Sequence, residues 1–262
     1  MDILNPIYTS EEKIKSLRSQ FETAEPYQHL VMDDFLKLDI SDSLLDHFPT
    51  REEFDIHWDG MNEQKSEGSG FENWHPDFMK VKEMVMSKEF CDWVGKITGV
   101  ENSIVTDDKL GCGLHLGQDG SFLDVHVDFN MHHNINKFRR LNLLIYLNKD
   151  WKPEYGGHLE MWDKDMKNCV QKVSPDFNRA VIFETSSFSW HGYGKVSLPP
   201  EMRRRSFYSY FYTDEQGNQK SYRDTTFKTR PEDGVTKKVA TDLKENLKNG
   251  VKRTLKALGV KF

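Results

Sequence analysis

Three kinds of feature are missing from the sequence, and each absence narrows the class of protein. No run of about 18 apolar residues occurs, so the sequence predicts no transmembrane helix. The first residues carry neither the basic segment nor the apolar segment of a secretory signal. The three cysteines lie far apart without C-x-x-C spacing, which argues against a disulfide framework and against a cysteine-based zinc site. We therefore expect a soluble, cytoplasmic protein.

Basic residues are too few in most of the chain for nucleic acid to be the main partner. The net charge is −6, but residues 237–261 hold eight basic side chains against two acidic ones. That segment therefore has a charge of +6, which leaves −12 for the rest of the chain. Because an acidic body repels the phosphate backbone, we expect no nucleic-acid partner.

The composition is that of a folded protein. Of the 262 residues, 37% are hydrophobic and 12% are aromatic, and a disordered chain has fewer aromatic residues. A chain of this length can bury a full core. The pattern divides it into a helical N-terminal region at 1–104, a strand-rich core at 105–213 and a C-terminal extension at 214–262. We expect these parts to form one integrated domain.

The strand-rich core consists of short apolar runs separated by Gly, Asn, Asp and Pro. The predicted strands lie near residues 111–116, 122–128, 139–147, 157–162, 168–173, 178–184, 188–191 and 203–213. Eight short strands without a helical pattern among them are typical of a jelly roll. The predicted fold class is therefore mainly β with flanking helices, around a jelly-roll or cupin-like core.

The N-terminal region shows helical spacing, with Ser10 as an N-cap and Gly99 as a helix stop. One short strand is predicted at 29–32. Residues 57–74 are polar, contain glycines and lack periodicity, so we interpret them as a loop. A loop of this kind is either a mobile lid or a simple surface excursion.

The C-terminal extension ends in a predicted basic amphipathic helix at 237–262. Its apolar residues recur every three or four positions: Val239, Leu243, Leu247, Val251, Leu255 and Leu258. Such a face either docks on the acidic body or contacts a membrane surface or a partner helix. Docking is favoured because helices of globular proteins commonly show this pattern, and membrane contact is accordingly not expected.

A metal site is indicated by two residues of one predicted strand. His126 and Asp128 are two positions apart, so their side chains project from the same face. His191, in a later predicted strand, offers a third ligand that a jelly roll can bring close. Two histidines and one carboxylate are the ligand set of non-heme Fe(II) oxygenases. The alternative for His191 is a turn histidine that bonds only to backbone.

The last predicted strand begins with three arginines at 203–205. An arginine that points inward from a strand needs an anion, because burying it unpaired is very costly. Alternation places Arg204, Ser206 and Tyr208 on one face but does not decide which arginine points inward. A guanidinium holds a carboxylate bidentately, so the combination with a metal triad indicates a chelating dicarboxylate.

Taken together, these motifs carry a family resemblance. They are His126-x-Asp128, His191, the strand 140–151 followed by Gly156-Gly157, and Arg204-x-Ser206, with a weaker match at 29–35. The set resembles the Fe(II)- and 2-oxoglutarate-dependent dioxygenases, specifically the prolyl 4-hydroxylase-like branch. The resemblance covers about residues 105–213. It implies a double-stranded β-helix in which His126, Asp128 and His191 bind Fe(II) and Arg204 pairs with the distal carboxylate of 2-oxoglutarate.

The resemblance also implies further contacts to the co-substrate, from Ser206, Tyr146, Asn142 and His115. Tyr146 matches a tyrosine that hydrogen-bonds the distal carboxylate, and Asn142 shares its strand face and would lie nearby. Strand packing is the alternative interpretation of both. His115 stands where relatives often place a tyrosine near the metal-bound end of the co-substrate. Ascorbate is a further candidate cofactor.

The implied activity is hydroxylation of a C–H bond, with release of succinate and CO₂. Asp128 favours hydroxylation because halogenating relatives lack this carboxylate. The substrate would be peptidyl or free proline, another amino acid or another small molecule. Candidate contacts to it are the segment 57–74 and the segment 130–137 with His132 and His133. No feature predicts the oligomeric state.

Two other functions use the same residues differently. A cupin-type metal isomerase or hydrolase would need the triad but no arginine for 2-oxoglutarate, so Arg204-x-Ser206 and Tyr146 count against it. A catalytically silent binding module would keep only the jelly roll. Silent relatives usually lose a metal ligand, whereas this chain retains all three.

Overall fold

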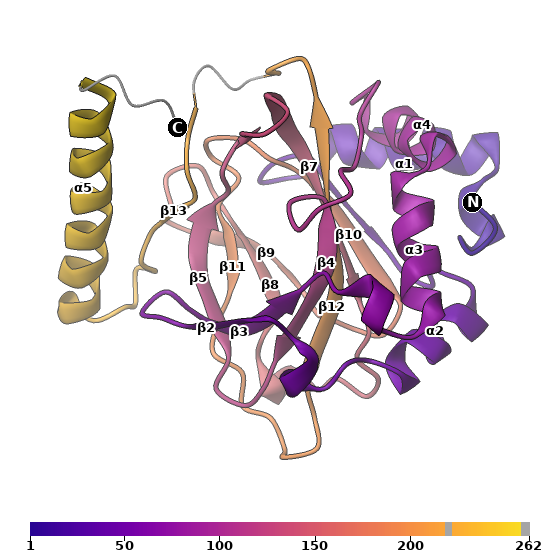
Figure 1. Cartoon of the computed structure of the whole chain (residues 1–262), viewed down its shortest axis with the longest axis horizontal. Coiled ribbons are helices and arrows are strands. Elements are labelled where there is room, and N and C mark those ends of the chain that lie inside the picture. Colours follow the sequence, from indigo (N-terminus) through magenta and orange to yellow (C-terminus); the bar gives the residue numbers. More distant parts are fainter. Residues whose placement is uncertain (218–221, 258–262) are drawn as a thin grey trace.

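One continuous antiparallel sheet dominates the fold (Figure 1). The structure is a computed structural model that describes residues 1–217 and 222–257, with side chains through Leu247. Within these residues the strands are β1 (His29–Met32), β2 (Ile56–Asp59), β3 (Glu63–Gly68), β4 (Cys112–Gly117), β5 (Phe122–Val127), β6 (Met131–His132), β7 (Lys137–Tyr146), β8 (Leu159–Trp162), β9 (Cys169–Val173), β10 (Arg179–Glu184), β11 (His191–Tyr193), β12 (Arg204–Thr213) and β13 (Thr226–Phe227). Their order is β1-β10-β7-β12-β4-β3-β5-β11-β8-β9, with β2 on β3, β6 on β7 and β13 on β5.

The sheet curls so that its two halves face each other. β1, β10, β7, β12 and β4 form one half, β5, β11, β8 and β9 form the other, and β3 joins them. Apolar side chains of β7 and β10 pack against those of β8 and β9, and residues from both halves line one internal cavity. The predicted mainly-β jelly roll is confirmed. All eight predicted strands are present, although β11 begins at His191 rather than near residue 188.

Four helices cover the outer face of the first half of the sheet (Figure 1). They are α1 (Glu11–Thr23), α2 (Leu38–Asp46), α3 (Pro76–Met86) and α4 (Lys88–Thr98). Ser10 caps α1 by accepting a hydrogen bond from the Lys13 N–H, and Gly99, with φ +77°, ends α4 in the left-handed conformation. Leu141, Leu143 and Ile145 of β7 pack against these helices, and the alternate residues of β7 face the cavity.

The interpretation of residues 57–74 as a loop is wrong for residues 57–68. Residues 56–68 form the hairpin β2–β3, and β3 pairs with both β4 and β5. The inward residues of β3 are charged, so the strand lacks the apolar alternation that usually reveals one. Of the three aromatic residues in this segment, Phe71 and Trp74 belong to the core beneath the helices, and Trp58 lines the cavity.

The C-terminal helix α5 (Val235–Ala257) stands on the side opposite to the other four helices (Figure 1). It contacts the body through polar residues: Lys237 bonds to Asp124, while Thr241 and Lys244 bond to Asn62. The prediction that its apolar face docks on the body is wrong for the described side chains, because the row Val235, Val239, Leu243 and Leu247 is exposed. The side chains of Val251 and Leu255, and Leu258 itself, lie outside the described residues.

No helix in the described ranges combines the length and the apolar character that crossing a membrane requires.

Candidate metal centre

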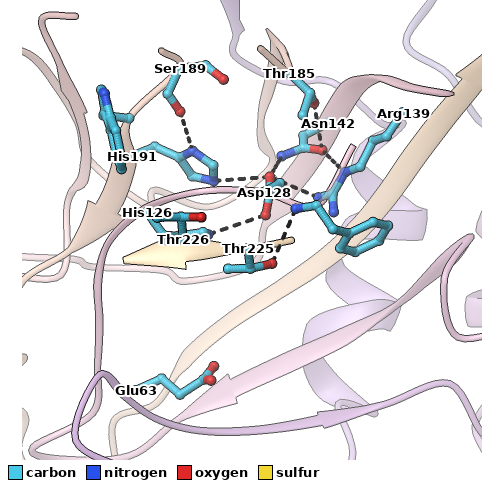
Figure 2. Close-up of polar contacts among 12 residues, drawn as sticks. Glu63, His126, Asp128, Arg139, Asn142, Thr185, Ser189, His191, Thr225 and Thr226 are labelled. Carbon is cyan, nitrogen blue, oxygen red and sulfur yellow. Dashed lines mark hydrogen bonds and ion pairs between the residues drawn. The ribbon is translucent and has the colours of Figure 1, made fainter. Parts of the chain in front are cut away.

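Three predicted ligands meet at the open end of the cavity. His126 lies near the end of β5, Asp128 follows that strand, and His191 opens β11 directly opposite His126 in the antiparallel ladder. Their potential ligand atoms all lie within 4.8 Å of one another. Nε2 of His126 is 3.3 Å from Oδ1 of Asp128, and Nε2 of His191 is 3.5 Å from Oδ2 (Figure 2). All three residues are buried.

Backbone carbonyls orient both imidazole rings. Nδ1 of His126 lies 2.9 Å from the Asp124 carbonyl oxygen, and Nδ1 of His191 lies 2.9 Å from that of Ser189. Because a carbonyl oxygen only accepts, each Nδ1 carries the proton and each Nε2 keeps its lone pair. Two imidazole nitrogens and a carboxylate thus converge with their lone pairs available. This donor set fits a divalent first-row metal such as Fe(II).

The carboxylate of Asp128 is held from behind by Arg139 and Asn142. Its Oδ2 lies 3.1 Å from Nη2 of Arg139 and accepts a 2.7 Å hydrogen bond from Nδ2 of Asn142 (Figure 2). Burial alone would raise the pKa of Asp128, but the guanidinium of Arg139 holds that pKa well below its usual range. Asp128 is therefore ionised and fixed in direction, as a metal ligand must be.

Sequence reasoning missed Arg139, and an irregularity in β7 explains why. Simple alternation puts Arg139 on the same face as Leu141, away from Asn142. Opposite Phe211 and Tyr212 of β12, however, β7 contains one extra residue, so Arg139 turns to the cavity side. There its guanidinium stacks 3.4 Å from the ring centre of Tyr210. No pattern in the sequence marks this bulge.

The C-terminal extension closes the metal centre from the other side. Arg223 donates hydrogen bonds to the backbone oxygens of Asp128 and Ser186. Thr225 accepts one from the N–H of Phe129 (Figure 2). β13 pairs with β5, which places the ring of Phe227 5.4 Å from that of His126. The sequence does not predict that these residues belong to the site, because β13 has only two residues and shows no strand pattern.

Arg204 lies at the other end of the same cavity, whose volume is about 390 Å³. Its side chain is buried, donates 2.9 Å to the Gly157 carbonyl and 3.4 Å to the Tyr146 hydroxyl, and stacks 3.9 Å from the ring of Tyr193. Among the ion pairs of the described residues Arg204 has no carboxylate partner. Arg203 is turned to the surface and bonds to Pro200.

The other predicted co-substrate residues divide between the two ends of the cavity. Ser206 of β12 pairs with His115 of β4 on one side and with Tyr146 of β7 on the other, one inward position from Arg204. Asn142 does not lie beside Tyr146, contrary to expectation. It sits at Asp128, because four residues of extended strand separate the two side chains by about 13 Å.

Beside the main cavity lies a second, more open hollow. Phe129 borders both spaces, and the hollow is lined further by Met131, His133 and Tyr222. The segment 130–137 therefore contributes to a surface next to the site. His132, a candidate substrate contact that we interpret more readily as a solvated loop histidine, is instead buried with Nε2 3.1 Å from Oδ2 of Asp108.

Comparison with known proteins gives one family match and one curated relative. Residues 112–212 match the sequence model of the 2OG-Fe(II) oxygenase superfamily. Over 132 residues, 49% of this chain, the sequence is 28% identical to prolyl 3-hydroxylase OGFOD1 of Mus musculus. The match covers 22% of that protein, so the comparison concerns less than a quarter of the relative's length.

Solved structures with a similar fold include two enzymes of bacteria. The crystal structure of a prolyl-4-hydroxylase from Pseudomonas putida superposes with a TM-score of 0.55 at 19% identity, covering 76% of this chain and 98% of that one. An oxidoreductase of the 2OG-Fe(II) oxygenase family from Burkholderia pseudomallei gives 0.51 at 12% identity, covering 81% and 96%. At these identities the likeness establishes the fold.

Proposed function

We propose that the protein is a 2-oxoglutarate-dependent hydroxylase, because residues 112–212 match the 2OG-Fe(II) oxygenase superfamily. His126, Asp128 and His191 would hold Fe(II). Bound Fe(II) would activate O₂, so that one oxygen atom oxidises 2-oxoglutarate to succinate and CO₂ and the other hydroxylates a C–H bond of the substrate. The relatives named above include prolyl 3- and 4-hydroxylases, so peptidyl or free proline is the first substrate class to examine, before other amino acids and small molecules.

One observation carries this proposal. A buried guanidinium without a carboxylate partner among the described residues, Arg204, lines the same cavity as two histidines and an aspartate. An unpaired buried cation is costly unless a ligand supplies the anion. A dicarboxylate that chelates a metal at one end and pairs with Arg204 at the other satisfies both ends of the cavity. A cupin-type isomerase would not need a buried arginine at the position of Arg204. A catalytically silent scaffold would not need the three metal ligands.

Different side chains of the cavity would orient the metal ligands, bind the co-substrate and exclude water. Arg139 and Asn142 hold Asp128 ionised and aimed, and the two backbone carbonyls fix the histidine rings. Arg204 and Tyr146 would grip the distal carboxylate of 2-oxoglutarate. Apolar side chains that line the cavity exclude water and strengthen these electrostatic contacts: Leu123, Leu144, Leu159 and Phe183.

The test is release of ¹⁴CO₂ from 1-¹⁴C-labelled 2-oxoglutarate in the presence of Fe(II), O₂ and a panel of proline-containing peptides, free proline and other amino acids. We expect release that depends on Fe(II) and is stimulated by at least one panel member, together with a product heavier by one oxygen. The variant D92A, which removes an exposed aspartate of α4 paired with Lys88, is the control for D128A. Equal release by wild type and D128A would overturn the proposal.

A further inference from the structure

The hairpin β2–β3 brings a lysine into the cavity between two carboxylates. Lys65 is the central inward residue of β3, with Glu63 and Glu67 on either side of it on the same face. Its side chain is only 9% exposed. Nζ lies 3.1 Å from Oε2 of Glu67 and 4.0 Å from Oε2 of Glu63, and 3.3 Å from Nε2 of His115.

These distances determine which nitrogen of His115 carries the proton. An ammonium group only donates, so at 3.3 Å from Lys65 the Nε2 of His115 must be an acceptor. Glu67 could instead take a proton from Nε2, but its Oε2 lies 3.7 Å away, beyond hydrogen-bond reach. The proton of the neutral ring is therefore on Nδ1.

The electrostatics of the cluster agree with this assignment. Burial alone would lower the pKa of Lys65, but Glu67 and Glu63 outweigh it and raise that pKa. Burial, and after it the charge of Lys65, lower the pKa of His115 to about 4, and they outweigh Glu67, which acts in the opposite direction. Lys65 is thus charged and His115 neutral at physiological pH.

His115 occupies a place where its Nδ1–H can meet a ligand. Its ring lines the cavity, stacks on Tyr208, and shares a rung of the sheet with Ser206 and Tyr146, one inward position from Arg204. In the described part of the chain the ring has its hydrogen-bond partner at Nε2, and none is found for Nδ1. The free N–H therefore lies in the half of the cavity where the proposed co-substrate would bind.

Resting on the proposed function, we propose that Lys65 is a positioning residue for the co-substrate. Its ammonium group fixes His115 with the proton on Nδ1, and that N–H donates a hydrogen bond to the bound keto acid. Glu67 keeps Lys65 in place and also accepts a hydrogen bond from the Tyr208 hydroxyl. The hairpin thus takes part in binding 2-oxoglutarate although it lies outside the segment that matches the family model.

The first arm of the test measures the tautomer directly and needs neither metal nor turnover. Long-range ¹H–¹⁵N correlation spectra of the metal-free, histidine-labelled full chain distinguish Nδ1–H from Nε2–H rings, and H115N identifies the signal. We expect Nδ1–H for His115 at pH 7 in the wild type and a different proton distribution in K65M. An Nε2–H signal, or no change in K65M, would overturn the assignment.

The second arm measures the KM for 2-oxoglutarate and kcat separately. Losing a hydrogen bond to a charged ligand corresponds to about 10-fold to 100-fold in affinity. We therefore expect K65M to raise KM at least 10-fold with kcat largely retained, and K65R to restore most of the difference. H115N, whose amide can replace Nδ1–H, should raise KM less than H115Q. K88M, which removes an exposed lysine of α4 paired with Asp92, is the control.

The pH profile separates positioning from simple packing. The charged or titratable groups that act on His115 are Lys65 and Glu67 from β3, and Arg204 and Tyr208 from β12. In the wild type the ring stays neutral from pH 6 to 8. Without Lys65 the pKa of His115 lies closer to its ordinary value. The ratio of the KM of K65M to that of the wild type should therefore change between pH 6 and pH 8. A constant ratio would contradict the positioning role.

The two proposals fail in distinguishable ways. If the wild type binds no 2-oxoglutarate, the proposed function fails, whatever tautomer the spectra show. If it binds 2-oxoglutarate and K65M binds it equally well, only the role of Lys65 fails.

Discussion

The guanidinium of Arg139 lies 3.1 Å from Oδ2 of Asp128, so the carboxylate of the candidate metal triad is already ion-paired before any metal binds. Arg139 is itself fully buried between the rings of Tyr210 and Phe129. The pair makes the metal-free site stable, because each charge neutralises the other in a low-dielectric interior. It also leaves Oδ1 directed toward His126.

Breaking this pair should destabilise the metal-free protein. R139M leaves Asp128 buried without a cation, and removing one member of a buried pair costs about 3–5 kcal/mol. We expect the free energy of unfolding, measured by urea denaturation at pH 7, to fall by that order, and Fe(II) or Zn(II) to restore part of the loss by supplying the missing charge. R139K, which keeps the charge, should lose less. An unchanged stability would show that Asp128 does not depend on Arg139.

Arg204 and its neighbour provide a matched pair of substitutions. R204A should raise the concentration of 2-oxoglutarate required for half-saturation by two orders of magnitude or more, since the lost contact is with a buried anion and is worth about 3–5 kcal/mol. R203A changes a side chain that bonds to Pro200 at the surface and should leave this requirement unchanged. The measurement is calorimetric titration under anaerobic conditions. Equal effects of the two variants would remove Arg204 from the co-substrate site.

The stability of the metal-free protein should fall in mild acid, and His115 should account for one part of the loss beside His191, whose pKa burial also lowers to about 4. The pKa of His115 is about 4 in the folded state against 6.5 ordinarily, so the unfolded chain binds the proton more readily. The stabilisation is complete above pH 6.5 and is lost as pH falls toward 4, by an amount on the order of 1–3 kcal/mol. Urea denaturation of metal-free protein at pH 7, 5.5 and 4.5 measures it. H115N should show a smaller loss in this window, and identical curves would contradict the assignment.

Phe227 should affect how much of the 2-oxoglutarate turnover leads to hydroxylated substrate, and it should not affect metal binding. Its ring forms part of the cavity wall beside His126, so F227A opens the metal centre to water. We expect 2-oxoglutarate turnover to persist while the ratio of hydroxylated product to succinate drops several-fold. L243A, which alters an exposed side chain of α5, serves as the control. A ratio equal to that of wild type would mean that β13 does not shape the substrate space.

Parts of this architecture could be predicted from the sequence because they depend on local periodicity. His126 and Asp128 share a face through alternation in β5, and His191 begins a strand that lies beside them. The jelly roll followed from eight short apolar runs. The approximate bounds of the strands followed from the turn residues between them.

The remaining features depend on tertiary context that the pattern does not encode. One extra residue in β7 turns Arg139 inward. β3 has charged inward residues because it faces a polar cavity, so it was mistaken for a loop. The row of apolar residues on α5 predicted docking of that face. The helix instead contacts the body through Lys237 and Lys244, which hydrogen-bond to Asp124 and Asn62.

Anaerobic titration of the Fe(II)-loaded protein with 2-oxoglutarate, followed by visible absorption, examines the metal ligands and the co-substrate site together. We expect the weak charge-transfer band of an iron–keto-acid chelate in the wild type and its loss in H191A. Iron binding without a band would favour the cupin-like alternative. Absence of iron binding would contradict the assignment of His126, Asp128 and His191 altogether.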